Sequence, residues 1–270
     1  RRRQHDAYAQ WVAEIMLQQT RVETVLNYYA RFLKRFPDVP SLARADSQEV
    51  LKHWEGLGYY RRILHLHRAA RQLQEQHQEI PSTVEGLREL PGVGEYTAAA
   101  IASIAFGHPV AAVDGNVQRV VSRLVRLAVS PKVREGKEQV AGLAATLLSP
   151  RRPGDFNQAW MDLGSLICTP RAPQCDRCPL LLGCAAGKRG DAESYPVRES
   201  GTSRTPREVR LVVGVFVHGQ TVLVRRRAEG GLWSGLWEFP SGELSTGNSP
   251  LRALDDLPAD IAAPYAELMG

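Results

Sequence analysis

The four cysteines of the chain lie close together in the sequence, at Cys168, Cys175, Cys178 and Cys184. Four thiolates in so short a segment can bind Zn²⁺ or a [4Fe–4S] cluster, since both accept four cysteine ligands. Zinc sites usually present two Cys-x2-Cys pairs, whereas only Cys175 and Cys178 are spaced in that way. The spacing therefore favours a [4Fe–4S] cluster held by all four cysteines. Such clustering also favours a metal site in a reducing compartment over a disulfide framework.

Two carboxylates stand where they could do acid–base chemistry. Glu14 lies near the edge of an apolar stripe that repeats at helical spacing, formed by Tyr8, Trp11, Val12, Ile15 and Met16. It is therefore either a solvated helix acid or a side chain that borders a cleft. Asp114 precedes an expected helix from Val117 to Leu127. It is either the N-cap of that helix or a second acid that faces the same cleft as Glu14.

A Gly-x-Gly turn at Gly92, Val93 and Gly94 separates two expected helices. The first helix begins at a capping box of Ser82 and Glu85, and the second covers residues 97–106. The glycines leave the backbone of the turn uncovered, and the unpaired amides at the next helix N-terminus attract a phosphate. Two helices joined by such a hairpin form an arrangement that binds one DNA strand through its backbone. The same turn also occurs as an ordinary connector between helices.

A second glycine turn, Gly56–Gly58, is followed by Tyr59, Tyr60, Arg61 and Arg62. Aromatic rings beside a base-binding groove can stack on bases or wedge between them, and arginine pairs with phosphate. The alternative is a corner between two helices with the tyrosines packed inward. The sequence alone leaves both interpretations open.

The composition is that of a basic globular protein. Its 270 residues suffice for two domains. The net charge of +5 and the pI of about 9.2 just reach the level expected of a nucleic-acid-binding domain. No apolar run approaches the roughly 20 residues that span a membrane, and no signal peptide is visible. Because the chain starts with Arg1-Arg2-Arg3, we expect a fragment of an intracellular protein, cytoplasmic or nucleoid-associated in a bacterium and nuclear or mitochondrial in a eukaryote.

Helical periodicity continues through most of the chain. Further helices are expected over residues 22–36, from Asp46 onward, over the alanine-rich residues 98–105 and over residues 156–164. From 185 to 206 the composition shifts to Gly, Ser, Arg, Glu and Pro, which predicts a linker. The period then changes to two, so Val209–Val217 and Thr221–Arg225 are expected to be strands joined by a turn over residues 218–220.

Several motifs together resemble the helix-hairpin-helix DNA glycosylases of the endonuclease III superfamily, and most closely the MutY-type adenine DNA glycosylases. The cysteine spacing, the hairpin and Asp114 match the superfamily. The adenine-specific branch is matched by Glu14–Thr20, Gly56–Tyr60, Asp114–Val117 and Phe156–Gln158. The resemblance implies a mostly α fold: a six-helix domain over about residues 15–130, a [4Fe–4S] domain made of the N-terminal segment and about residues 131–184, and an active site in the cleft between them.

The resemblance also implies a reaction. The substrate would be adenine mispaired with 8-oxoguanine or guanine in duplex DNA, and the adenine must leave the base stack before its N-glycosidic bond can be hydrolysed. Glu14 would be the general acid that protonates the adenine ring nitrogen. Asp114 would stay ionised and stabilise the oxocarbenium-like sugar. Tyr96 and Asn116 would support that sugar and the attacking group.

Other residues would bind the substrate, again by resemblance. The adenine pocket would be lined by Gln158, Leu17 and Arg2. The duplex would be contacted near the 8-oxoguanine and along its phosphates by Gln18, Gln19, Thr20, Leu57, Gly58, Tyr59, Gly92, Val93 and Gly94. The expected partner is therefore double-stranded DNA that contains an A:8-oxoguanine or A:G mispair. We expect no membrane contact and a monomeric protein.

The last segment, residues 207–270, resembles the Nudix-like domain that this family uses to sense 8-oxoguanine. A Nudix hydrolase carries a Glu-rich helix that binds metal, whereas the stretch after Gly242-Glu243 offers only Leu251–Asp256. We therefore expect an incomplete α+β recognition module that does not hydrolyse nucleotides.

Two other functions compete with adenine excision. A bifunctional glycosylase/lyase of the endonuclease III type needs an amine nucleophile to form a Schiff base, and the family places that lysine just after the hairpin. Here Tyr96 occupies this position, and no lysine lies between Leu90 and Asn116. A non-catalytic Fe–S module that binds DNA would need no acids in a cleft, so its function would not depend on Glu14.

Overall fold

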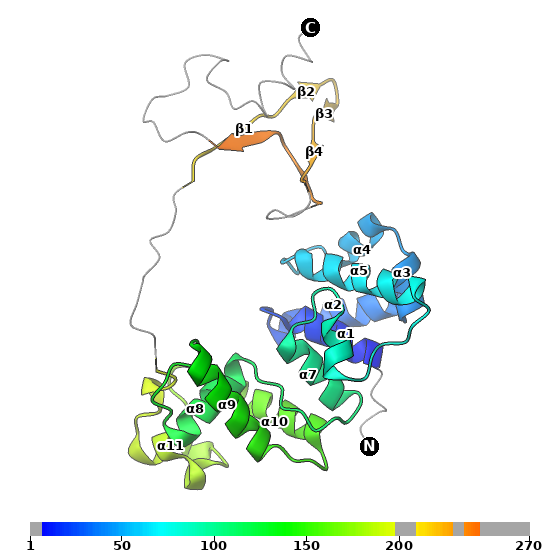
Figure 1. Ribbon diagram of the computed structural model, residues 1–270. Coiled ribbons are helices and arrows are strands. Elements are labelled where there is room, and N and C mark those ends of the chain that lie inside the picture. Colours follow the sequence, from blue (N-terminus) through cyan, green and yellow to red (C-terminus); the bar gives the residue numbers. More distant parts are fainter. Residues whose placement is uncertain (1–6, 198–208, 229–234, 244–270) are drawn as a thin grey trace. The chain divides into compact units, whose positions relative to one another are not determined.

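The computed structural model describes residues 7–197, 209–228 and 235–243. The chain divides into two compact units, Arg1–Ser200 and Gly201–Gly270. The described part of the first unit is helical, and that of the second is built from short strands (Figure 1). The mostly α prediction is confirmed. Arg2, expected in the adenine pocket, and residues 251–256 lie outside the described residues.

The helices of the first unit fall into an N-terminal and a C-terminal group (Figure 1). The N-terminal group consists of α1 (Ala7–Leu17), α2 (Val22–Arg35), α3 (Val39–Arg44), α4 (Ser47–Trp54), α5 (Arg61–Glu75), α6 (Val84–Arg88) and α7 (Glu95–Ile104). The C-terminal group consists of α8 (Gly115–Val125), α9 (Arg134–Leu147), α10 (Pro153–Leu166) and α11 (Ala185–Arg189), with short 3₁₀ turns at Cys175–Arg177, Leu181–Gly183 and Ala192–Ser194.

Helix α1 forms the centre of the N-terminal group, where it packs against α2, α5 and α7. Its apolar stripe is fully buried, as the periodicity predicts, with Trp11, Val12 and Met16 completely shielded from solvent. Phe32 of α2 and Trp54 of α4 extend this core, with their rings edge to face at a centroid distance of 6.1 Å. Aromatic pairs in this geometry add to the stabilisation that burial alone provides.

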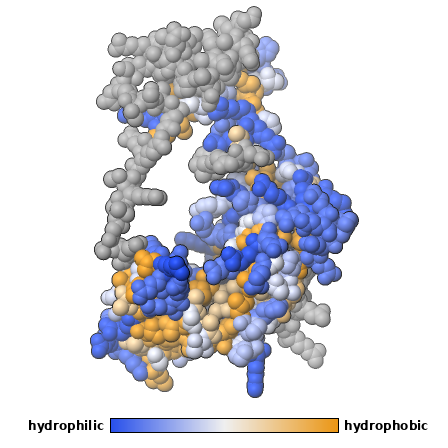
Figure 2. Space-filling view, viewed as in Figure 1, coloured by the Kyte–Doolittle hydropathy of each residue, from blue (hydrophilic) through white to orange (hydrophobic). Residues whose placement is uncertain are grey.

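The C-terminal group has a smaller core between α8, α9 and α10, formed by Val117, Val120, Val121, Leu127, Val140, Ala144 and Trp160. Its surface differs from that of the first group. Figure 2 shows apolar residues gathered over α9 and α10, whereas the face over α3 and α5 is mostly hydrophilic. Leu147 and Leu166, at the ends of these two helices, are exposed.

The two groups of helices meet where α10 packs against α7. Gly154, in the first turn of α10, lies against the backbone of α7. A Cβ placed on Gly154 would come within 2.7 Å of the Ser103 carbonyl oxygen and 2.8 Å of the Ile104 Cα. Only a residue without a side chain fits there, so the contact between the groups depends on this glycine.

Side-chain caps explain where several helices begin. Asp46 accepts a hydrogen bond from the Gln48 amide at the start of α4, and Asp114 caps α8. Helix α6 begins one residue later than the expected capping box, because Thr83, and not Ser82, accepts the hydrogen bond from the Gly86 amide. Thr83 already offers the required hydroxyl, so the sequence contained two adjacent candidates for one cap.

The predicted linker over residues 185–206 is wrong in its first part. Residues 185–189 form helix α11, which packs against α8. Asp191 forms a salt bridge with Arg126 (2.5 Å), and the Tyr195 carbonyl accepts a hydrogen bond from the Arg123 Nε (3.0 Å). The polar composition of residues 185–206 indicated a linker, but the polar groups just named have partners on α8 and directly after it.

The described part of the second unit contains three antiparallel strand pairs. They are β1 (Leu211–Val213) with β6 (Ser241–Glu243), β2 (Val217–His218) with β3 (Thr221–Val222), and β4 (Arg225–Arg226) with β5 (Trp237–Glu238). The turn predicted over residues 218–220 is confirmed by the pairing of His218 with Thr221. The continuous strand predicted over Val209–Val217 is broken, since residues 214–216 belong to no strand.

No helix within the described ranges is long and apolar enough to cross a membrane.

The contact at Gly154 predicts a stability effect. Gly154→Ala should lower the free energy of unfolding by about 1–3 kcal/mol, because the new methyl group has to push two backbones apart. Chemical denaturation monitored by circular dichroism measures this. Gly142→Ala is the matched control: Gly142 is exposed on α9 with nothing within 4 Å of its Cβ position. It should raise stability by about 0.5–1 kcal/mol through helix propensity. Equal effects at the two sites would contradict the packing argument.

Candidate active site

Glu14 lies on α1 and is buried, with 5% of its surface exposed. Its Oε1 accepts a hydrogen bond from the Gln10 Nε2 (2.7 Å), one turn earlier on the same helix. Its Oε2 accepts one from the Tyr96 hydroxyl (3.0 Å). Burial raises the pKa of the Glu14 carboxyl above its usual range, and the charge of Asp114 raises it further, while the two hydrogen bonds oppose this shift. Glu14 is therefore an acid that keeps its proton to higher pH than an exposed glutamate does.

Tyr96 comes from the first turn of α7, directly after the hairpin, and is half-buried. Its hydroxyl lies within hydrogen-bonding distance of Glu14 and also of the Met161 Sδ (3.1 Å) on α10. Burial, followed by the charges of Glu14 and Asp114, raises the pKa of the Tyr96 phenol. Tyr96 therefore stays neutral and keeps a hydroxyl hydrogen to donate.

Asp114 has the first of the two roles that the sequence left open, that of a helix N-cap. Its Oδ1 caps helix α8 by accepting a hydrogen bond from the Val117 amide (2.7 Å), and its Oδ2 accepts one from the Asn116 Nδ2 (2.8 Å). Its charge also contributes to the raised pKa of both Glu14 and Tyr96. Hydrogen bonds thus join Glu14 to Tyr96 and Asp114 to Asn116, and the charge of Asp114 links the two pairs, while their roles in a reaction stay predictions.

A chain of hydrogen bonds leads from Asp114 toward the cysteines. The amide oxygen of Asn116 accepts from the Arg119 Nη2 (2.9 Å), and the Arg119 Nε donates to the Cys168 carbonyl oxygen (2.8 Å). Gly164 of α10 closes one side of this chain, because a Cβ there would lie 2.6 Å from the Asn116 Cβ. The orientation of Asn116, and through it that of Asp114, is therefore fixed from both α8 and α10.

The hairpin has the geometry expected of a backbone-binding turn. Gly92 has a φ of +81°, which favours glycine, and a Cβ there would lie 2.6 Å from the His65 Cβ. Gly94 is the N-cap of α7 and provides no side chain to bond the first amides of that helix. These amides have no partner within the helix, so they are available to a phosphate.

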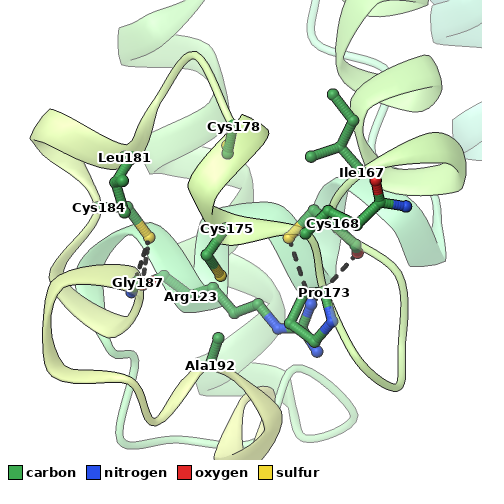
Figure 3. A pocket seen from close by; sticks show the side chains of 11 residues that line it. Arg123, Ile167, Cys168, Pro173, Cys175, Cys178, Leu181, Cys184, Gly187 and Ala192 are labelled. Carbon is green, nitrogen blue, oxygen red and sulfur yellow. Dashed lines mark hydrogen bonds between the residues drawn. The ribbon is translucent and has the colours of Figure 1, made fainter.

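The four cysteines line one cavity in the C-terminal group, together with Arg123 (Figure 3). The cavity contains about 300 Å³ of space not filled by atoms, part of it open to solvent. Within the described residues, no three His, Cys, Asp or Glu side chains are grouped so that they could hold a single metal ion.

Hydrogen-bond donors point at two of the cysteine sulfurs. The Arg123 Nη1 lies 3.3 Å from the Cys168 Sγ, and the Gly187 amide lies 3.3 Å from the Cys184 Sγ (Figure 3). Arg123 has 1% of its surface exposed. Among the described residues it makes no ion pair with a carboxylate, and it donates only to Cys168 Sγ and to backbone carbonyls. A buried cation needs a compensating negative charge, and thiolates around the cavity would provide one.

Comparison with known proteins identifies the family. The profile described as "HhH-GPD superfamily base excision DNA repair protein" matches residues 12–144. The adenine DNA glycosylase of Buchnera aphidicola subsp. Schizaphis graminum is 34% identical over 237 residues, which cover 87% of this chain and 67% of that protein. This chain belongs to the HhH-GPD superfamily of base excision DNA repair proteins.

Further comparisons agree with this family assignment. The human protein named adenine DNA glycosylase is 39% identical over 280 residues, covering 87% of this chain and 51% of the human protein. The chain thus spans about half the length of that relative. Among solved structures, a thermostable thymine-DNA glycosylase is 28% identical with a TM-score of 0.64, over 70% of this chain and 87% of the other. An endonuclease III–DNA complex, at 24% identity and a TM-score of 0.60, shares the fold.

Leu17, predicted to line the adenine pocket, and the residues predicted to contact DNA differ in their exposure. Leu17, Gln19 and Tyr59 are exposed, and the latter two have positive φ angles of 58° and 48°. Gln18 is half-buried, with its Nε2 donating to the Thr97 hydroxyl (3.2 Å). Leu57 has only 6% of its surface exposed, so its side chain packs inward in this structure. Their roles toward DNA stay predictions.

Sequence reasoning missed the role of Arg62. It is buried, and its guanidinium donates to the carbonyls of Ile15, Met16, Gln18, Leu57 and Gly58 and to the Thr20 hydroxyl. It therefore ties the end of α1 to the Gly56–Tyr60 turn. Of the two arginines offered as phosphate contacts, only Arg61 is exposed. Two adjacent arginines look alike in the sequence, and only the fold decides which one is buried.

Asn157 was also missed, although it lies within a quoted motif. Its Oδ1 accepts from the Ala112 amide (3.1 Å), and its Nδ2 donates to the Ser103 hydroxyl (2.8 Å) and the Val110 carbonyl (2.9 Å). It thereby holds the segment that leads to Asp114. The neighbouring Gln158, predicted to bind adenine, is half-buried and donates only to the Gly154 carbonyl of its own helix (3.2 Å).

The raised pKa of Glu14 predicts a pH-dependent cost in stability. The Glu14 carboxyl contributes most to the free energy of unfolding below the pKa of an unfolded glutamate. This contribution is lost as the pH rises through the pKa of the folded state, at about 1.4 kcal/mol for each unit by which the two pKa values differ. Glu14→Gln should therefore raise the melting temperature at neutral pH by about 2–4 °C for each kcal/mol regained. The gain should shrink in acid. Calorimetry at several pH values measures this, with the exposed Glu89→Gln as control. A gain that does not change with pH would contradict the assignment.

Proposed function

We propose that this chain is the catalytic part of an adenine DNA glycosylase. It removes adenine mispaired with 8-oxoguanine or guanine from duplex DNA by hydrolysing the N-glycosidic bond, and it leaves the strand intact. The observation that carries this proposal is the pairing of two carboxyls in different surroundings. Glu14 is buried and has a raised pKa, whereas Asp114 accepts two hydrogen bonds at a helix N-terminus.

The two carboxyls suit the two charges that the reaction creates. Glu14, as the protonated acid, donates to the adenine ring nitrogen and makes the base a better leaving group. Asp114, as the carboxylate, stabilises the positive charge that develops on the sugar. The Asn116 amide and the Val117 N–H hold the Asp114 oxygens in place. Tyr96 donates to the carboxylate that Glu14 becomes after it has given up its proton.

The surface near these acids suits a flipped nucleotide. The adenine has to leave the duplex, and the exposed Tyr59 and Gln19 lie on the turns that Arg62 joins. The Gly92–Gly94 hairpin, followed by the first amides of α7, which have no partner within that helix, would hold the phosphate backbone. The net charge of +5 favours DNA as a partner. The protein would act as a monomer on DNA, in the nucleoid of a bacterium or in the nucleus or mitochondria of a eukaryote.

A non-catalytic module fits the site less well. Burying an ionisable group costs stability, and a protein that only binds DNA gains nothing from a buried Glu14 linked to Tyr96. The named relatives are adenine DNA glycosylases.

In the second unit, the part of the chain that contains strands β1 to β6 would recognise 8-oxoguanine. We do not propose that this part hydrolyses nucleotides.

The proposed activity is tested with duplexes that contain adenine opposite 8-oxoguanine, guanine or thymine. The chain should release adenine from the first two, and strand breaks should appear only after treatment with alkali. Glu14→Gln should lower the single-turnover rate by at least about 10²-fold, since general acid catalysis contributes about 10²–10⁴-fold, while duplex binding persists. Glu89→Gln should leave the rate unchanged. Wild-type protein that binds these duplexes without releasing adenine would refute the proposal.

The absence of strand cleavage has its own control. A phenol cannot form an imine with the sugar aldehyde, and the raised pKa keeps Tyr96 neutral. Borohydride should therefore trap almost no protein–DNA adduct. Tyr96→Lys should introduce trapping and nicking, because position 96 faces Glu14 across the site. Efficient trapping by the wild-type chain would mean that another amine reaches the sugar.

We also propose that Cys168, Cys175, Cys178 and Cys184 hold a [4Fe–4S] cluster. Zinc would require four sulfurs about 2.3 Å from one ion, whereas a cluster takes one thiolate at each of its separate irons. The four cysteines line one cavity, and their spacing, with a single Cys-x2-Cys pair, supports the cluster. Arg123 and the Gly187 amide would donate to the ligand sulfurs. When bound, the cluster would crosslink the segment between Cys168 and Cys184.

Anaerobic purification tests the cluster directly. The protein should be yellow-brown, with broad absorption near ~400 nm and about four irons per chain. Cys175→Ser should reduce the iron content and lower solubility or DNA affinity more than it changes the chemistry at Glu14. Colourless protein with one zinc per chain would overturn the assignment, and iron content unchanged by Cys175→Ser would remove that residue from the ligand set.

A further inference from the structure

The Tyr96 hydroxyl has one hydrogen and two acceptors within reach. It lies 3.0 Å from the Glu14 Oε2 and 3.1 Å from the Met161 Sδ. A hydroxyl can donate to only one of them at a time in a good geometry, while its oxygen can still accept. Which acceptor it uses therefore depends on the charge state of Glu14.

An ionised Glu14 accepts the hydrogen bond from the Tyr96 hydroxyl. A carboxylate is a stronger acceptor than a thioether, so the Tyr96 hydroxyl then points at the Glu14 Oε2. In that state Glu14 receives two hydrogen bonds, because the Gln10 Nε2 donates to Oε1.

A protonated Glu14 needs a different arrangement. Its proton cannot point at the Gln10 Nε2, which is itself a donor 2.7 Å from Oε1. On Oε2 the proton can point at the Tyr96 oxygen, provided that the Tyr96 hydrogen turns away. The Met161 Sδ is the acceptor toward which it can turn. Glu14 gains one O–H bond when it takes up the proton, and no bond of Tyr96 forms or breaks, because its hydroxyl only rotates between two acceptors.

We propose that Met161 is a positioning residue that accepts the Tyr96 hydroxyl hydrogen and thereby stabilises the protonated form of Glu14. This inference rests on the proposed function, in which the protonated Glu14 is the reactive form. When Glu14 gives its proton to the base, the Tyr96 hydroxyl rotates back and stabilises the carboxylate that remains.

Among the described residues, three further influences on Glu14 besides Met161 and Tyr96 are known, namely burial, Gln10 and Asp114. Its pKa depends on burial, on Tyr96 from α7, on Gln10 from α1 and on the charge of Asp114 at the start of α8. Helices α2 and α5, which also pack against α1, add no charged group to that set. Met161 is uncharged and acts only through Tyr96, so its effect can be separated from that of Asp114.

The experiment measures the Glu14 titration in the full chain by ¹³C NMR of labelled glutamate, with the signal identified by its loss in Glu14→Gln. Met161→Leu keeps the apolar volume but removes the acceptor. Its titration midpoint should fall by about 0.5–1 pH unit, the size of one neutral hydrogen bond. The pH at which single-turnover adenine release declines should fall by the same amount, because the reaction needs protonated Glu14. Met16→Leu, a buried methionine on α1, should shift neither.

Met161→Gln separates hydrogen bonding from packing. Its amide oxygen can accept from Tyr96, so the midpoint should return to the wild-type value or rise above it. A packing role predicts the reverse order, with leucine tolerated better than glutamine and neither variant moving the midpoint. In the Tyr96→Phe background, Met161→Leu should no longer shift the titration.

Several outcomes would overturn the inference. They are an unchanged Glu14 midpoint in Met161→Leu, equal shifts in the leucine and glutamine variants, or a shift that persists in Tyr96→Phe. These results are distinct from a failure of the proposed function, which would appear as wild-type protein that releases no adenine. Because NMR measures the titration without substrate, the coupling between Met161 and Glu14 is tested in either case.

Discussion

The burial of one carboxyl group, that of Glu14, imposes conditions on the rest of the first unit. An ionisable side chain away from water needs hydrogen-bond partners that suit more than one charge state. Gln10 of the same helix provides one partner and Tyr96 of α7 the other, and the Tyr96 hydroxyl also lies near Met161 of α10. The acid on α1 is therefore joined to α7 directly and to α10 through Tyr96.

The packing between the N-terminal and C-terminal groups of helices depends on two glycines and on one asparagine whose side-chain amide is fully hydrogen-bonded. Gly154 lets α10 approach α7, and Gly164 lets it approach Asn116. Asn157 bonds to three groups on both sides of the junction. None of the three contacts a reacting group, yet together they set the distance between the helix that carries Met161 and the segments that carry Tyr96 and Asp114. Backbone approach and one buried amide thus determine the geometry of the acids.

How much the sequence revealed depended on whether a signal was local. Helix periodicity placed α1 and α2 because burial on one face repeats along one segment. The cap at Asp114 is one of two interpretations that its neighbours in the sequence allow, whereas the burial of Glu14 depends on packing between α1 and the distant α7. The motif resemblance supplied what periodicity could not. Arg62 differs from Arg61 only because two distant turns contribute acceptors for its guanidinium. The linker predicted after residue 185 is partly wrong because polar groups in it have partners at α8. Burial of a polar group is a tertiary property.

Helix α8 links the acid site to the cysteine cavity because it bears a functional group on every turn. Its N-cap Asp114 belongs to the acid site, and Asn116 holds that carboxylate. One turn on, Arg119 bonds both Asn116 and the Cys168 carbonyl, and Arg123 reaches the Cys168 sulfur. Residues 119 and 123 are four apart and so share one face of the helix. A shift of Cys168 would therefore be transmitted to Asp114 through two side chains on one rigid element. The cysteine segment need not contact Asp114 to influence its position, because it fixes the helix that this carboxylate caps.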